Sequence, residues 1–355
     1  MRHLTTQRQA KLMKEACSME WDSGRDVANT CQRCQHKMQT IAELLLLSYY
    51  ARPIRYLNKS LGYNIEKINS TMRIISSLVE DVLLSIHGLS NKSEVVCEKL
   101  EEILENVILL SEYCSQVAYM LTTKYPGATP AVLGIIDKYE VSRAGLEVDI
   151  SCSRLKQSKQ EELALSSQLV IDLCSNISKY ISILTDICRV PAEELENESL
   201  KDQFKLCVKS VTCAVGCLIA SVKTFKSEPT WNHHSRLIVF AEPVIASVSA
   251  LVSLATEDEF IGTEAALTRE AKDVQREILS VCMSVVSACI QLCRIVREVA
   301  FSTFTSHYRD KAQMCLETVE RASKQLTDSL QQHRDQDESS PPSSEDDSPL
   351  SNFQV

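Results

Sequence analysis

The sequence predicts an all-α protein, and three observations lead to this prediction. The chain of 355 residues contains eight glycines and nine prolines, which is few for the many turns of a strand-rich protein. Apolar residues make up 44% of the chain and recur every three or four positions over long stretches. This is the spacing of one face of a helix, and no segment shows a convincing strand alternation. The pattern predicts about nine helices.

The N-terminal third predicts an arm followed by three helices. Residues 1–30 mix charged and polar side chains without a sustained period, so we expect a flexible N-terminal arm there. The stretch CQRCQHKMQTIAELLLLSYYARPI begins at Cys31 and predicts the first helix, with Cys34, Met38, Ile41 and Leu45 facing the core. Two regular stripes predict the next two helices: Ile65, Ile68, Met72, Ile75, Val79, Val82, Ile86 and Leu89, then Val96, Leu100, Ile103, Val107, Leu110, Cys114, Val117 and Leu121.

Two breaks enclose four further helices. The first break is KYPGATP, which ends at Pro130, and the second is TEDEFIGTE, near residues 256–263. Less regular patterns between them cover about 133–157 and 161–189, and Pro191 is expected to interrupt the chain. Clean stripes then cover residues 204–225 and 237–255, the second with a kink or restart expected at Pro243.

Two helices and a tail complete the chain. The longest stripe places ten apolar residues in unbroken three-four alternation: Leu267, Ala271, Val274, Ile278, Val281, Val285, Ala288, Leu292, Ile295 and Val299. A last helix is expected over about 304–333. Residues 334–355 are acidic and rich in serine and proline, so we expect them to be disordered.

Charge and cysteine usage narrow the class of protein. A formal charge of −9 argues against a nucleic-acid binder. The N-terminus has no apolar signal-peptide core, and the longest uncharged run, Ile278–Cys293, is too short and too rich in serine to span a bilayer. Fifteen cysteines fall mostly on apolar helix faces. We therefore expect a cytoplasmic protein with reduced thiols and no membrane insertion.

A metal site or an active site is not expected. Cys31 and Cys34 have zinc spacing and His36 is close, but structural zinc takes four ligands and no second CxxC pair exists. The ligand count therefore favours core packing for these cysteines. His233 and His234 are adjacent, so on a helix they point about 100° apart and suit solvent better than a shared metal. Phosphate-loop, dinucleotide, zinc-protease and nucleophile-elbow motifs are all missing, so we expect no catalytic residue and no cofactor.

Several runs resemble one known family. The stretch from Cys31 to Ile54, KDQFKLCVKS, SVSALVSLATEDEF and MSVVSAC are similar, in this order, to the talin rod domain-containing protein 1 family, also called mesoderm development candidate 1. That family resembles the seventh and eighth domains of the talin rod. The resemblance implies a five-helix bundle formed by residues 31–127 and 261–333. It also implies a four-helix bundle, 128–260, inserted between the third and fourth of those helices.

The resemblance also implies a function. Members of the family are expected to be intracellular homodimers, joined through the four-helix bundle, that bind and bundle actin filaments in the cytoskeleton and in filopodia, with links to cell migration and adhesion. An alternative is a talin-like scaffold that docks amphipathic helices of adhesion or cerebral cavernous malformation adaptors without bundling actin. A groove with small side chains such as Gly216, Ala220, Ala246 and Ala250 would suit this alternative.

Five lysines form a candidate contact for the acidic actin filament. Between Ser199 and Ser227 they share one arc of the predicted helix with a single acid, Asp202, nearby; they are Lys201, Lys205, Lys209, Lys223 and Lys226. The simpler interpretation is a solvated helix face.

A second candidate surface is the dimer interface. Phe240 and Leu254 lie toward one edge of the stripe over 237–255, and Ser247 lies on the same line. A half-exposed Phe beside a Leu suits a helical dimer seam. The simpler interpretation is that a neighbouring helix of the same bundle covers them.

Overall fold

The computed structural model describes residues 2–54, 59–86, 89–157, 167–302 and 305–338. Within these ranges the chain is almost entirely helical, which confirms the predicted all-α class. The nine long helices are α1 (Arg2–Leu47), α2 (Leu61–Ser85), α3 (Leu89–Thr122), α4 (Lys138–Gln157), α5 (Ser167–Glu194), α6 (Glu198–Ser227), α7 (Trp231–Ala255), α9 (Arg269–Val299) and α10 (Ser306–Glu338). Two short helices, η1 (Ser48–Tyr50) and α8 (Asp258–Ile261), follow α1 and α7.

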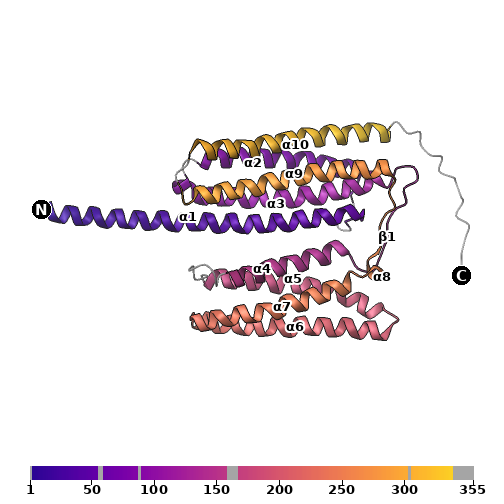
Figure 1. Cartoon of the computed structure of the whole chain (residues 1–355), viewed down its shortest axis with the longest axis horizontal. Helices are drawn as coiled ribbons and strands as arrows, with labels where there is room; N and C mark the ends of the chain where they lie inside the picture. The colour runs from indigo at the N-terminus through magenta and orange to yellow at the C-terminus, as the bar shows by residue number, and fades with distance from the viewer. Residues whose placement is uncertain (1, 55–58, 87–88, 158–166, 303–304, 339–355) are drawn as a thin grey trace, which may run out of the picture.

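Helices α1, α2, α3, α9 and α10 pack into one bundle around a common core (Figure 1). Among the described helices, α9 supplies the most side chains to this core, because its apolar stripe is buried from Ala271 to Val299. Thr268 caps the start of α9, where its hydroxyl accepts a hydrogen bond from the backbone N–H of Ala271. The long stripe read from the sequence is thus the main source of the larger core.

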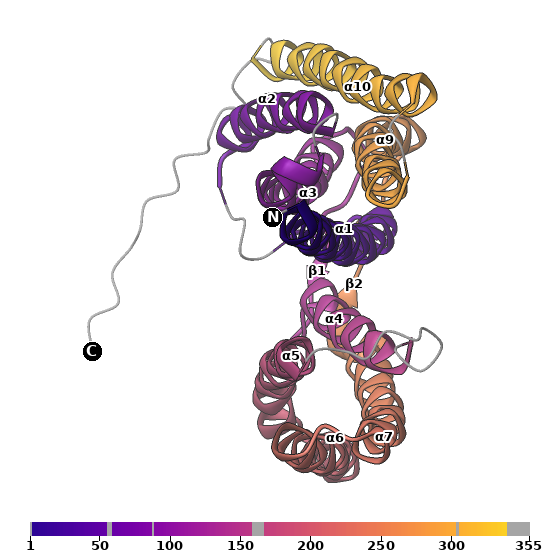
Figure 2. The same ribbon diagram turned by 90° about the vertical axis from the view of Figure 1, so that its left-hand side faces the viewer.

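Helices α4, α5, α6 and α7 form a second bundle with a core of its own (Figure 2). Side-chain caps begin the last two helices: Asn197 accepts from the N–H groups of Ser199 and Leu200, and Thr230 accepts from that of His233. The ring of Phe260, on α8, meets Phe204 edge-on with the centroids 5.1 Å apart. This contact closes the bundle at the end where the chain leaves it.

The four-helix bundle is inserted between α3 and α9 of the five-helix bundle. The outgoing and returning linkers pair as two short antiparallel strands, β1 (Val132–Leu133) and β2 (Gly262–Thr263), which the sequence analysis did not predict. Gly134 is required here, because an added Cβ would lie 2.1 Å from the carbonyl oxygen of Phe260. Gly262 adopts a φ of 71°, which also favours glycine.

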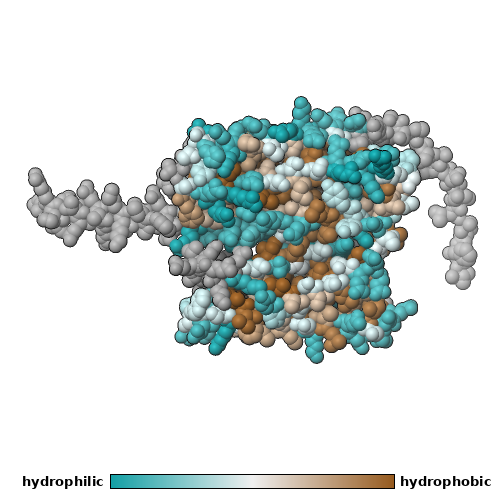
Figure 3. Space-filling model, viewed as in Figure 1, coloured by the Kyte–Doolittle hydropathy of each residue, from teal (hydrophilic) through white to brown (hydrophobic). Residues whose placement is uncertain are grey.

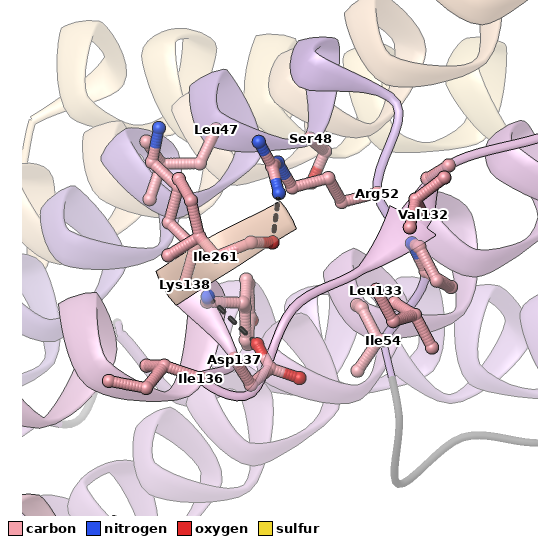
Figure 4. A pocket seen from close by; sticks show the side chains of 13 residues that line it. Leu47, Ser48, Arg52, Ile54, Val132, Leu133, Ile136, Asp137, Lys138 and Ile261 are labelled. Atoms are coloured by element: carbon pink, nitrogen blue, oxygen red, sulfur yellow. Dashed lines mark hydrogen bonds between the residues drawn. The ribbon is translucent and has the colours of Figure 1, made fainter. Parts of the chain in front are cut away.

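Further contacts join the two bundles beside this strand pair. The guanidinium of Arg52 donates to the carbonyl oxygen of Ile261 at 2.5 Å (Figure 4) and to that of Gly262 at 3.1 Å. The ammonium of Lys138 lies 4.3 Å from the centroid of the Tyr50 ring. Arg143 on α4 forms an ion pair with the buried carboxylate of Glu112 on α3. The contacts at this end fix where the inserted bundle sits.

Three expectations about helix ends were wrong. Residues 2–30 belong to α1, where a flexible arm was predicted, and Val27 and Cys31 already lie in the core. The helix α10 continues to Glu338, beyond the predicted end at residue 333, and residues 339–355 of the predicted tail lie outside the described residues, as does Phe304. Neither Pro191 nor Pro243 interrupts its helix, since α5 continues to Glu194 and α7 runs unbroken from Trp231 to Ala255. The predicted domain boundaries as a whole stay predictions.

Candidate functional site on helices α6 and α7

The five predicted lysines lie along α6, and their surroundings differ. Lys201 bonds to Glu198 and Lys205 to Asp202, each within one turn of the helix, so these two positive charges are partly compensated. Lys209, Lys223 and Lys226 are exposed and form no ion pair among the residues that the structure describes. The uncompensated positive charge of the stripe therefore belongs to these three side chains.

The outer face of α6 and α7 is apolar and uncovered. Leu206 is 65% exposed, Trp231 61% and Val239 64%, and Cys213 and Cys217 are exposed beside them. A groove of about 560 Å³ runs between the two helices, lined by Cys217, Ala220, Ser221, Thr224, Ser235, Arg236, Val239 and Phe240. Exposed apolar surface of this kind is typical of an interface.

The three predicted interface residues take different positions. Phe240 is half-buried and lines the groove, with part of its ring against the bundle core. Leu254 is also half-buried against that core. Ser247 is buried, and its hydroxyl donates to the carbonyl of Val244 at 3.1 Å. The sequence analysis missed Val239, an exposed residue that lines the same groove. Its position outside the buried stripe of α7 was visible on a helical wheel.

The lysine stripe and the groove occupy different parts of the α6 surface, with centres about 120° apart around the helix. At about 100° per residue, the lysines cluster about 100° to one side of the buried Phe204–Phe225 stripe. Cys217, Ser221 and Thr224 lie on the other side, toward α7, and Ala220 points almost directly away from the stripe. Lys223 borders the groove at Ala220 and Thr224, whereas Lys209 lies about 12 Å along α6 from Cys217, so an occupant of the groove leaves Lys209 accessible.

By length and composition alone, three described helices, α6, α7 and α9, are apolar enough to span a membrane. Within the fold, 67% of the apolar window of α9 is buried, against 28% for each of α6 and α7. The latter two therefore keep apolar surface that their own bundle does not cover. The prediction of no membrane insertion stays a prediction.

Cys31 and Cys34 lie in the core of the five-helix bundle, together with Met38, Ile41 and Leu45. This confirms the packing interpretation of that stretch. Burial raises the pKa of the Cys31 thiol far above its usual range and that of Cys34 to about 11. Both side chains are therefore neutral thiols at physiological pH, and a metal ligand must be a thiolate. Among the described residues no group of three His, Cys, Asp or Glu side chains is placed to hold a metal.

The two adjacent histidines of α7 have separate surroundings. His233 is half-buried, and its Nδ1 lies 2.7 Å from the carbonyl oxygen of Glu228. His234 is buried, with its ring centroid 5.9 Å from that of Phe225 and 5.5 Å from that of Trp231. Burial lowers the pKa of His234, and the expectation that both are solvated is therefore wrong for this residue.

Comparison with known proteins assigns the inserted bundle to one kind of domain. Residues 136–258, which span α4 to α7, match the Talin IBS2B domain. The chain is 22% identical to a talin of Oscarella pearsei over 251 residues, 70% of this chain and 9% of that protein. It is 22% identical to human talin-2 over 193 residues, 54% of the chain and 7% of talin-2.

A third relative extends over more of the chain. Chicken talin-1 is 20% identical over 271 residues, 76% of the chain and 10% of talin-1. The chain thus spans a tenth or less of the length of each of these talins. The matched domain is a helical scaffold fold, and the expectation that the chain has no catalytic residue stays a prediction. Four helices inserted into five, with a Talin IBS2B match over the insertion, make this a talin-rod-like protein.

Proposed function

We propose that this chain binds and bundles actin filaments as a homodimer joined through the outer face of α6 and α7. The observation that carries the proposal is the uncovered apolar groove that Phe240 and Val239 line. Similarity to talins supports a role among cytoskeletal and adhesion proteins. The proposed location is the cytoplasm and projections such as filopodia. Bundling needs two filament sites, and a two-fold dimer of this chain supplies them.

The filament contact in this proposal is the exposed part of the lysine stripe. Lys209, Lys223 and Lys226 lie on one arc of α6, and about 21 Å separates the first two along the helix. An acidic filament is attracted by such a rigid basic stripe, and the attraction weakens as salt rises. Because the lining of the groove on α6 begins at Cys217, about 12 Å along the helix from Lys209, a dimer seam in the groove leaves the N-terminal part of the stripe accessible.

The dimer is tested with Phe240→Asp. A carboxylate in an apolar seam should weaken the dimer by about a hundredfold or more, and the groove position of Phe240 should let the bundle stay folded. Wild type should pellet with actin at low speed, because filaments are bundled, and the variant only at high speed. Leu84→Asp, an exposed apolar position on α2, is the matched control. A folded Phe240→Asp variant that sediments as a dimer would contradict the interface.

The filament contact is tested with Lys209→Glu combined with Lys223→Glu. We expect this pair to lower actin binding by about tenfold or more and to leave the dimer intact. The control pair is Lys272→Glu with Lys324→Glu, which makes the same charge change at exposed positions of the five-helix bundle. An equal loss of binding in both pairs would point to net charge, and would argue against a specific stripe.

A second candidate function is an adaptor scaffold that docks amphipathic helices without bundling actin. The α6–α7 groove favours it, because Ala220, Ser221 and Thr224 leave room for a partner helix. Helices of adhesion or cerebral cavernous malformation adaptors are the proposed ligands. If wild type pellets with actin at neither speed while such a peptide binds the groove, the scaffold function replaces the bundling function.

A further inference from the structure

A second groove lies where the two bundles meet. Helix α4 forms its floor, α1 one wall and α7 the other, and the volume is about 400 Å³. The lining residues are Glu43 and Leu47 from α1, Ser142, Gly145, Leu146 and Asp149 from α4, and Ile245, Val248, Ser249 and Val252 from α7. The face seen in Figure 3 shows apolar side chains gathered in the region between α1 and α7.

The floor of this groove is shaped by close packing. Gly145 brings α4 against α7, since an added Cβ would lie 2.8 Å from a methyl group of Val252. Leu47, Leu146, Ile245 and Val252 are only half-buried, so each keeps apolar surface open to the groove. Between Ser142 and Asp149 the floor is about 10 Å long, which suits roughly two turns of a helical ligand.

The acidic side chains at the rim of the groove favour a basic ligand. The two charged side chains that line the groove, Glu43 and Asp149, are both exposed carboxylates, and they stand on different helices. The nearest α4–α7 ion pair, Lys156 with Glu242, lies beyond this lining and is internally compensated. A ligand with an apolar stripe and basic flanks therefore complements both the floor and the rim.

We propose that this groove docks a short amphipathic helix of a partner protein, with apolar anchors spaced i, i+3 or i+4, i+7 and with Lys or Arg beside them. The site is separate from the α6–α7 face and from the lysine stripe, so it does not depend on the proposed dimer. A helix seated here contacts α1 of one bundle and α7 of the other. Binding therefore adds a bridge between the two bundles to the direct packing of α1 against α4.

The test uses two synthetic peptides and the full chain. The first peptide has about fourteen residues, with leucines at helical spacing flanked by lysines, and the second has glutamates in place of the lysines. Fluorescence anisotropy of labelled peptide measures the affinity. Wild type should bind the basic peptide at least about tenfold more tightly than the acidic one.

Two variants locate the binding. Glu43→Lys combined with Asp149→Lys should weaken the basic peptide by about tenfold and strengthen the acidic one, because both changed side chains are exposed at the rim. Ser249→Trp should fill the groove and abolish binding of both. The control pair, Glu66→Lys with Asp328→Lys, makes the same charge change at exposed positions of α2 and α10 and should leave binding unchanged.

Several results would overturn the inference. Equal affinity for the two peptides would show that the rim carboxylates do not favour a basic ligand. Unchanged peptide binding by the Ser249→Trp variant would show that the peptide binds outside this groove. If Ser249→Trp converts a dimer into a monomer, a second copy of this chain covers the groove. The Phe240→Asp variant should bind the peptide as well as wild type does. The proposed dimer interface and the proposed peptide groove can therefore be refuted independently of each other.

Discussion

His234 lies in the first turn of α7, with its ring against Phe225 and Trp231. Burial favours the neutral imidazole, so the pKa of His234 is lowered from its ordinary 6.5. Burial also lowers the pKa of His36, to which the neighbouring charges of Arg154 and Arg297 contribute. The fold thus favours the neutral form of both side chains, and both bind protons more readily once the chain unfolds.

The free energy of unfolding should therefore fall as the pH decreases through 6.5. In this range the unfolded chain takes up protons that the folded chain does not, and the fall stops below the lowered pKa. His234→Phe keeps a ring between Phe225 and Trp231 and should make the decrease in stability between about pH 7.5 and about pH 5.5 smaller. Urea unfolding at the two pH values measures this, with His307→Phe, an exposed position, as control. The same pH dependence in His234→Phe and wild type would rule out this role.

At the scale of the elements, periodicity and breaks were enough to predict about nine helices, whereas the insertion of one bundle into the other was expected from the resemblance to the talin rod. The stripe on α9 was predicted because one helix face carries the core, and KYPGATP was predicted as a break because it cannot continue a helix. The N-terminal part of α1 was missed, since a helix without an apolar stripe gives no period to detect. Strands β1 and β2 were missed because their pairing joins segments far apart in the chain.

The candidate sites were harder to predict than the elements. Lys209 and Phe240 could be placed on a flank from spacing alone, because a single helix determines that position. The burial of Ser247 and the exposure of Val239 depend on how α6 packs against α7. The groove above α4 needs three helices from two bundles, so Glu43 and Asp149 carry no local signal that brings them together.

At the scale of the whole molecule, the two bundles should unfold as one cooperative unit only while the contacts at their junction remain formed. The junction joins segments distant in sequence, because Arg52 follows α1 and its two acceptors, Ile261 and Gly262, lie at the return to α9 (Figure 4). Each bundle has its own core, so either one can unfold first when this tie is lost.

Arg52→Ala should therefore separate the unfolding of the two bundles. The guanidinium is half-buried, so losing its two charge-assisted hydrogen bonds should cost about 1–2 kcal/mol. Scanning calorimetry should then resolve two transitions, or a broadened one, where wild type shows a more cooperative unfolding. Arg276→Ala removes an exposed arginine that pairs with Asp273 within α9, and it should leave the transition unchanged. If Arg52→Ala unfolds as cooperatively as wild type, the strand pair and the Arg143–Glu112 ion pair suffice to couple the bundles.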